Sequence, residues 1–233
     1  MKLKTALFAT LVLAAGTAAA ADDGFYAGFG IGYGKINVNE NKITNSIDAI
    51  VNPYYDVTKS SVSQGATPYS FTVGYQFMKY LAIELGYIDL GNANYRSTLE
   101  CLGTTCNGPV TTDTGTVKGQ WDATGWPVTV LGIWPIDDSW SVFGRVGLFM
   151  GDVKATAKLV DASNGELVCG PNTCGREHAS ANSNEFIGGV GVDYTFLDKW
   201  TARLEWQAMP SLGNNKTGDG NWNNIQAAIL YHF

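Results

Sequence analysis

The chain has 233 residues, of which 45% are hydrophobic, 15% are charged and 28 are glycine. This composition is too apolar for a disordered chain. The formal net charge of −6, with no basic block, excludes the electrostatic footprint expected of a nucleic-acid-binding protein.

The first 21 residues have the layout of a secretory signal peptide. Two lysines precede an apolar run from Ala6 to Ala15, and an Ala-x-Ala pattern follows it. A membrane anchor is the alternative, but the apolar run is shorter than the ~20 residues that a spanning helix needs. We therefore expect residues 1–21 to be a cleaved signal peptide and residues 22–233 to form one exported domain.

From Asp22 onward, apolar side chains recur at every second position, which predicts β-strands. In the first segment Phe25, Phe29 and Tyr33 alternate with small residues, so that one face is aromatic and the other is mostly glycine. The pattern predicts eight strands, at residues 25–34, 69–77, 81–87, 121–134, 140–150, 185–194, 200–207 and 224–233. Short connections follow the second, fourth and sixth strands, and long ones follow the first, third and fifth. Short and long connections should therefore lie at opposite ends.

Two architectures fit eight alternating strands. In a soluble β-sandwich the apolar faces point inward, whereas in a membrane barrel they point to lipid. Trp134, Trp140 and Trp200 share the apolar parity immediately beside short turns, where a membrane barrel has an interfacial aromatic belt. Together with the signal peptide, the even strand number and strands of about ten residues, the position of these tryptophans favours the membrane barrel, which is an all-β fold. The specific prediction is an eight-stranded antiparallel up-and-down transmembrane β-barrel with long extracellular loops.

Charged residues occupy the opposite parity near the short turns. Glu84, Arg145, Asp193, Arg203 and Glu205 each lie a few residues from a turn, on four different predicted strands. At ~3.3 Å per residue they should share one layer of the barrel interior. Because unpaired charges are costly in so narrow a lumen, we expect this charge layer to pair internally and to block ion flow.

Four cysteines form two Cys-x4-Cys arrangements in polar stretches between predicted strands. Disulfides persist in oxidising compartments, so an exported chain is expected to contain two small loop disulfides, Cys101–Cys106 and Cys169–Cys174. Disulfides that join one pair to the other are the alternative. The spacing is not that of a zinc site, and no metal site is expected.

No catalytic or cofactor-binding pattern is present. His178 and Ser180 are a base and a nucleophile type two residues apart, but they lie in a stretch rich in Ser, Asn and Ala, where chance neighbours are common. The glycines at positions 28, 30, 32 and 34 repeat at a strict period of two, unlike a dinucleotide-binding fingerprint. We therefore expect a protein that is not an enzyme and binds no cofactor.

Several segments resemble the OmpA-like transmembrane domain family of outer-membrane barrels. They are residues 73–76 leading into 83–87, residues 135–138, residues 188–190 followed by 203–207, and the terminal Leu230-Tyr231-His232-Phe233. Together they cover nearly the whole mature chain in order, apart from the loops. The resemblance implies a monomeric barrel in the cell outer membrane, with both termini and the short turns in the periplasm.

The resemblance also implies a charged interior cluster. Glu84, Arg145, Arg203 and Glu205 occupy positions similar to it. The lysine that the family carries on the fourth strand has no counterpart, because Thr129, Leu131 and Ile133 occupy that parity.

Three functions are compatible with these features. The first is a structural or surface-recognition role through the long loops, because loops on a rigid scaffold commonly carry binding. The second is a narrow, mostly closed porin-like channel, and the third is a lipid-modifying outer-membrane enzyme. The expected partners are outer-membrane lipid and lipopolysaccharide, together with an unidentified surface ligand for the loops.

Overall fold

The computed structural model describes residues 24–38, 55–101, 114–161, 177–214 and 218–233, so the predicted signal peptide lies outside the described residues. Within these ranges the strands are β1 (Gly24–Val38), β2 (Tyr55–Ser63), β3 (Gly65–Ala66), β4 (Tyr69–Met78), β5 (Leu81–Cys101), β6 (Thr114–Pro135), β7 (Trp140–Asp161), β8 (Glu177–Phe196), β9 (Trp200–Asn214) and β10 (Gly218–His232). No helix in this part of the chain is long and apolar enough to cross a membrane.

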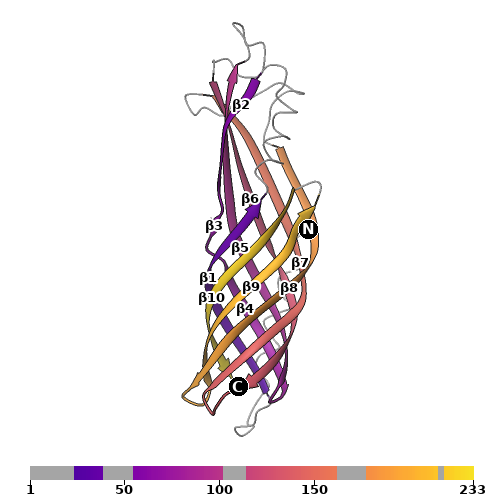
Figure 1. The fold of residues 1–233 in the computed structure, drawn as a ribbon. Helices are drawn as coiled ribbons and strands as arrows, with labels where there is room; N and C mark the ends of the chain where they lie inside the picture. The colour runs from indigo at the N-terminus through magenta and orange to yellow at the C-terminus, as the bar shows by residue number, and fades with distance from the viewer. Residues whose placement is uncertain (1–23, 39–54, 102–113, 162–176, 215–217) are drawn as a thin grey trace.

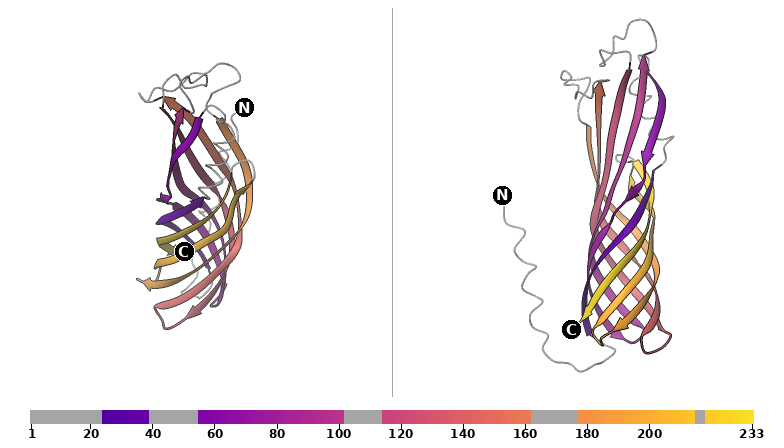
Figure 2. Two further views of the ribbon diagram at one scale, coloured as in Figure 1. Left: turned by 45° about the horizontal axis from the view of Figure 1, so that its top comes forward. Right: turned by 90° about the vertical axis from the view of Figure 1, so that its left-hand side faces the viewer.

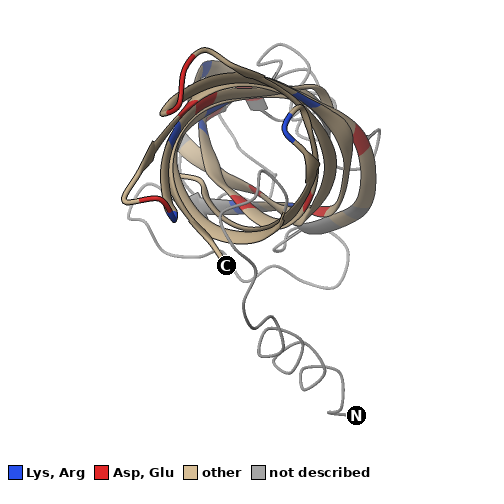
Figure 3. Cartoon of the chain, turned by 90° about the horizontal axis from the view of Figure 1, so that it is seen from below, with Lys and Arg blue, Asp and Glu red and all other residues tan. Residues whose placement is uncertain are grey.

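The strands form one closed antiparallel ring (Figures 1 and 3). Each strand from β4 to β9 pairs with the next along the chain, and β1 closes the ring by pairing with both β4 and β10. β2 and β3 are interrupted continuations of β4, because β2 pairs with β5 and β3 pairs with β1. The ring therefore has eight strand positions, which confirms the predicted fold class.

Side chains alternate between the exterior and the lumen, as β9 illustrates. Leu204 and Trp206 are 53% and 46% exposed, whereas Arg203 and Glu205 are buried. On β9 the exterior is thus apolar, while charged side chains face the interior. Closure of the ring pairs the eight ring strands, β1 and β4 to β10, along both edges, which is what a sheet needs in a solvent that cannot hydrogen-bond.

Aromatic side chains mark both borders of the apolar exterior. Trp134, Trp140 and Trp200 are exposed beside the short turns. Toward the other end, the exposed indole of Trp126 packs edge-on against Tyr87, with ring centroids 5.3 Å apart. Two such belts are typical of a membrane-spanning barrel, whose aromatic rings sit at the interfaces.

One side of the barrel is much taller than the other (Figure 2). β5, β6 and β7 have 21, 22 and 22 residues, whereas β1, β9 and β10 have 15 each. The predicted strands at 81–87, 121–134 and 140–150 are therefore too short. Beyond the apolar band the exposed positions become polar, so the alternation of apolar residues that identifies strands disappears while the hydrogen-bonded ladder continues.

We call the tall part the extended sheet, defined as β2 with residues 92–101 of β5, 114–122 of β6 and 154–161 of β7. A bulge between Asp89 and Asn92 marks its base on β5. Gly91 lies there at φ +76°, a left-handed conformation that glycine adopts without strain, and its N–H donates to the Asp89 carboxylate at 2.8 Å. The extra residue reverses the facing of β5. Even-numbered residues face inward below the bulge, and odd-numbered residues face inward above it.

Candidate functional site

The five predicted charge-layer residues meet in the lumen, near the short turns. Glu84 on β5 is the centre: one carboxylate oxygen accepts from Arg145 Nη2 at 2.6 Å, and the other accepts from Arg203 Nη1 at 2.7 Å. All of these side chains are nearly inaccessible to solvent. We call Glu84, Arg145, Asp193, Arg203 and Glu205 the ionic cluster.

Arg203 has the most complete set of partners in this cluster. Asp193, directly opposite it on β8, accepts from Nε and from Nη2, both at 2.8 Å, so the pair is bidentate. The guanidinium carbon of Arg203 also lies 4.3 Å from the ring centroid of Phe143. Arg203 is thus held by two carboxylates and one aromatic face.

Glu205 is the weakly held member of the ionic cluster. Its Oε2 lies 3.0 Å from Arg145 Nη2, but the alignment is not that of a hydrogen bond, and neither carboxylate oxygen has a hydrogen-bond partner among the described residues. Three acids face two arginines here. Glu205 is therefore the acid whose negative charge is least compensated by the two arginines.

Two contributors to the cluster are absent from the sequence prediction. The Tyr26 hydroxyl donates to Glu84 at 2.7 Å, and the ring of Phe143 lies beneath Arg203. With Ala82, Leu131 and Leu230 these rings form a lower apolar cluster, on the short-turn side of the charges. The signal was present in the parity, because Tyr26 shares the glycine-rich face of β1 and Phe143 shares the face of Arg145.

A layer of amides lies on the other side of the ionic cluster. Gln207 and Asn224 are opposite each other on β9 and β10, one inward position beyond Glu205 and Gln226. Both are buried, and below them Gln226 accepts a hydrogen bond from Ser70 at 3.1 Å. This amide layer separates the ionic cluster from the part of the lumen that lies nearer the long connections.

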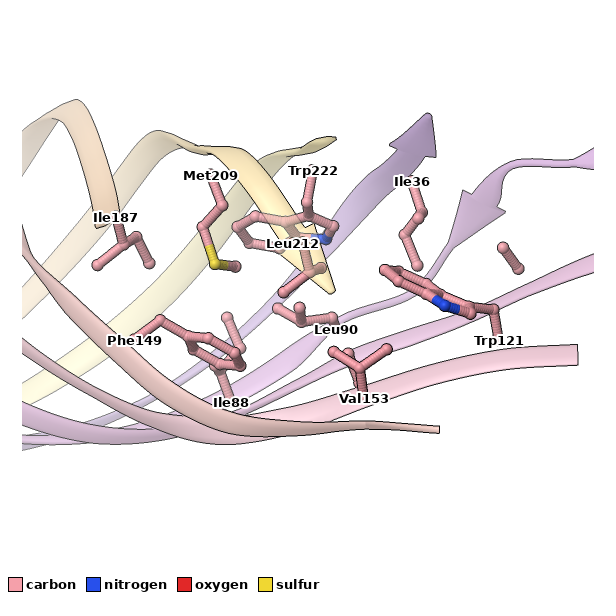
Figure 4. Close-up of a cluster of buried hydrophobic side chains, with 12 residues drawn as sticks. Ile36, Ile88, Leu90, Trp121, Phe149, Val153, Ile187, Met209, Leu212 and Trp222 are labelled. Carbon is pink, nitrogen blue, oxygen red and sulfur yellow. The ribbon is translucent and has the colours of Figure 1, made fainter. Parts of the chain in front are cut away.

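A second obstruction fills the lumen toward the long-connection end (Figure 4). It is an upper apolar cluster of Ile36, Ile88, Leu90, Ala93, Trp121, Ala123, Phe149, Val153, Ile187, Met209, Leu212 and Trp222. Most of these side chains are completely inaccessible, and they converge from β1, β5, β6, β7, β8, β9 and β10. The sequence prediction missed this cluster because eight of its twelve members lie beyond the predicted strand ends, where the alternation fades.

The outward face of the extended sheet is polar. Asn94, Gln120 and Thr156 form one row across β5, β6 and β7, and Asn92, Asp122 and Lys154 form another. In the second row Asp122 and Lys154 are direct cross-strand neighbours of opposite charge. This face continues the lipid-facing parity of β6 and β7 above the aromatic belt, so it projects from the membrane surface.

The predicted disulfides cannot be placed. Cys106, Cys169 and Cys174 lie outside the described residues, and of Cys101 only the backbone at the end of β5 is described. Ser180 lies exposed on β8, directly across from Lys154, and His178 pairs in register with Thr156. Among the described residues no group of three or more His, Cys, Asp or Glu side chains could hold a metal ion.

The family profile of the OmpA-like transmembrane domain matches residues 20–233. The chain belongs to this family. As a member of the OmpA-like family it is a protein of the cell outer membrane, in which the short turns of such barrels face the periplasm and the long connections face outward. The ionic cluster therefore lies in the lumen near the periplasmic end of the barrel, whereas the extended sheet is extracellular.

Solved structures of other outer-membrane barrels are similar to this OmpA-like chain at low identity. Ail, the attachment invasion locus protein of Yersinia pestis, crystallised with the heparin analogue sucrose octasulfate, shares 13% identity over 90% of this chain and 99% of its own, with a TM-score of 0.45. Neisserial surface protein A shares 11% over 90% and 97%, with a TM-score of 0.47. OprG from Pseudomonas aeruginosa shares 11% over 92% and 98%, with a TM-score of 0.44. No curated protein matches the chain.

Proposed function

We propose that this OmpA-like barrel is a closed scaffold that presents the extended sheet and its loops for recognition at the cell surface. The observation that carries the proposal is the height of that sheet. A membrane-spanning strand needs about 9–11 residues, whereas β5, β6 and β7 have 21 or 22. About half of each strand is therefore not needed to cross the membrane.

The filled lumen supports a scaffold over a channel. An eight-stranded interior is only wide enough for side chains. Here it is occupied in series by the lower apolar cluster, the ionic cluster, the amide layer and the upper apolar cluster. Ions would have to displace both paired charges and packed aromatic rings to pass through.

A single chain suffices for this scaffold. β1 and β10 pair over thirteen positions, from Tyr26↔His232 to Val38↔Gly220, so the ring closes without a strand from another copy. This supports a monomer in a surrounding of outer-membrane lipid and lipopolysaccharide. Recognition would then use polar and charged side chains of the outward face, such as Gln120 and Lys154.

The test shortens the extended sheet without touching the membrane barrel. Residues 94–120 are replaced by a two-residue turn, because Ala93 and Trp121 are cross-strand partners and the hairpin can close on them. Cells producing the wild type, the shortened variant or neither protein are compared for attachment to immobilised glycans and matrix proteins and for uptake of small solutes. Loss of attachment on shortening, with uptake equal in all three, is expected. Uptake that depends on the barrel, with attachment independent of the sheet, would overturn the proposal.

A further inference from the structure

We propose that the periplasmic half of the membrane-facing surface contains a binding site for one glycerophospholipid molecule. A groove with a volume of about 590 Å³ crosses the outside of β1, β10, β9, β8 and β7. Nine of its eleven lining residues belong to the parity that faces lipid, among them Trp140, Tyr194, Ala202, Leu204, Ala227 and Ile229. The other two, Arg203 and Ala228, belong to the parity that faces the lumen.

Two alanines create this groove in a belt of large side chains. Ala202 lies in register between Tyr194 on β8 and Ile229 on β10, and Ala227 lies between Leu204 and Ile31. The walls are rigid because Trp140 packs against Tyr194 with ring centroids 4.7 Å apart. A smooth belt would offer acyl chains only a convex surface, whereas this open recess has large side chains along its edges.

The position of the groove along the barrel indicates which membrane leaflet supplies the bound lipid. It begins at Trp140, the first residue of β7, and reaches Ala227, which is about five residues or roughly 17 Å along the strand from the periplasmic end of β10. With the usual tilt this covers about half of an apolar band ~25 Å tall. The occupant is therefore an acyl chain of the periplasmic leaflet, where glycerophospholipids reside.

The charges beside the groove select the head group. Lys199 lies in the turn before β9, three residues from Ala202, with Nζ 5.8 Å from the ring centroid of Tyr231. Asp198 precedes it, and the neighbouring turn with Asp138 is brought close by a Thr195 N–H donating to the Ser139 carbonyl at 2.8 Å. A lysine beside two aspartates complements a phosphate linked to a primary ammonium. Phosphatidylethanolamine therefore fits better than a head group with net negative charge.

The experiment measures lipids retained by the folded barrel. Full-length mature protein is purified from micelles containing equal amounts of phosphatidylethanolamine and phosphatidylglycerol, and its bound lipids are counted by native mass spectrometry. The variants are Lys199→Gln and the groove-filling pair Ala202→Leu with Ala227→Leu. Lys79→Gln is the matched control, because Lys79 lies exposed in the β4–β5 turn and no residue of β4 or β5 lines the groove, whereas residues of both β8 and β9, the strands joined at Lys199, do so. Unchanged heat-dependent gel migration verifies that each variant is folded.

Wild type and Lys79→Gln should retain one phosphatidylethanolamine in preference to phosphatidylglycerol. Lys199→Gln should lower this occupancy about threefold, the scale of one partly exposed ion pair, and the filled groove should lower it at least as much. Equal retention in the groove-filling variant, an equal effect of Lys79→Gln, or equal retention of the two lipids would each overturn the proposal.

Discussion

Arg203 and Asp193 face each other across β9 and β8 and share two hydrogen bonds of 2.8 Å in the sealed interior of the barrel. Removing the guanidinium by Arg203→Ala leaves Asp193 without its bidentate partner and Glu84 with one arginine in place of two. A buried charge without compensation is strongly destabilising, so we expect a loss of about 3–5 kcal/mol in the free energy of unfolding. Urea titration in lipid vesicles, followed by tryptophan fluorescence, measures it.

Glu205→Gln tests the charge balance of the same cluster. It removes the acid that has only one contact, at 3.0 Å from Arg145, and leaves two acids facing two arginines. We therefore expect a much smaller change in the free energy of unfolding than for Arg203→Ala. If the two substitutions were equally destabilising in the same urea titration, the ion-pair partners assigned to Arg203 and Glu205 would be wrong.

Gly74 and Gly132 form a matched pair for testing how Tyr26 is seated. A Cβ at Gly74 would overlap the ring of Tyr26, whose hydroxyl donates to Glu84, whereas a Cβ at Gly132 would meet nothing within 4 Å. Gly74→Ala should lower stability by about 1–3 kcal/mol through overpacking. Gly132→Ala should be neutral or raise stability by roughly 0.5–1 kcal/mol. Thermal unfolding of both variants in one detergent makes the comparison, and similar midpoints would contradict it.

The assignment of the outer face predicts a depth-dependent cost for an exposed arginine. Leu204, 53% exposed, lies within the apolar band, whereas Leu197, 78% exposed, lies in the β8–β9 turn. Leu204→Arg should destabilise the folded barrel by about 2–4 kcal/mol, and Leu197→Arg should destabilise it by about 0–1 kcal/mol. The measurement is the free energy of refolding into vesicles of defined thickness. Equal costs would mean that Leu204 does not face lipid.

The sequence could predict the barrel and its charged layer because both follow from one periodicity. Alternation of apolar residues identifies the membrane-spanning part of each strand, and its opposite parity brings Glu84 and Arg203 to one height. The same signal fails above the membrane, because the outward faces of β5 and β6 become polar there while inward residues such as Leu99 and Trp121 stay apolar. The Gly91 bulge also reverses the inward parity of β5, so Ala93 and the residues beyond it could not be assigned to a face from spacing alone.

Residues of the upper apolar cluster were missed for a related reason. Trp222 and Met209 are inward-facing in β10 and β9, but in sequence an apolar residue at an inward position near a loop looks like the end of the alternation. Charge pattern alone does not identify Tyr26 and Phe143, because both are uncharged rings that support the charges of the ionic cluster. Side-chain identity at inward positions therefore has to be considered together with parity.

The central claim is that two obstructions close the lumen in series: the ionic cluster with the two layers that flank it, and the upper apolar cluster. Single-channel recording in planar bilayers tests this claim most directly. Four proteins are compared: the wild type, Glu84→Ala, Trp222→Ala and the double variant. Glu84→Ala removes the acid that joins both arginines, and Trp222→Ala opens the upper apolar cluster. We predict no steady conductance from the wild type or from either single variant, because one obstruction remains in each, and measurable conductance from the double variant. A steady, large conductance from the wild type would contradict the account.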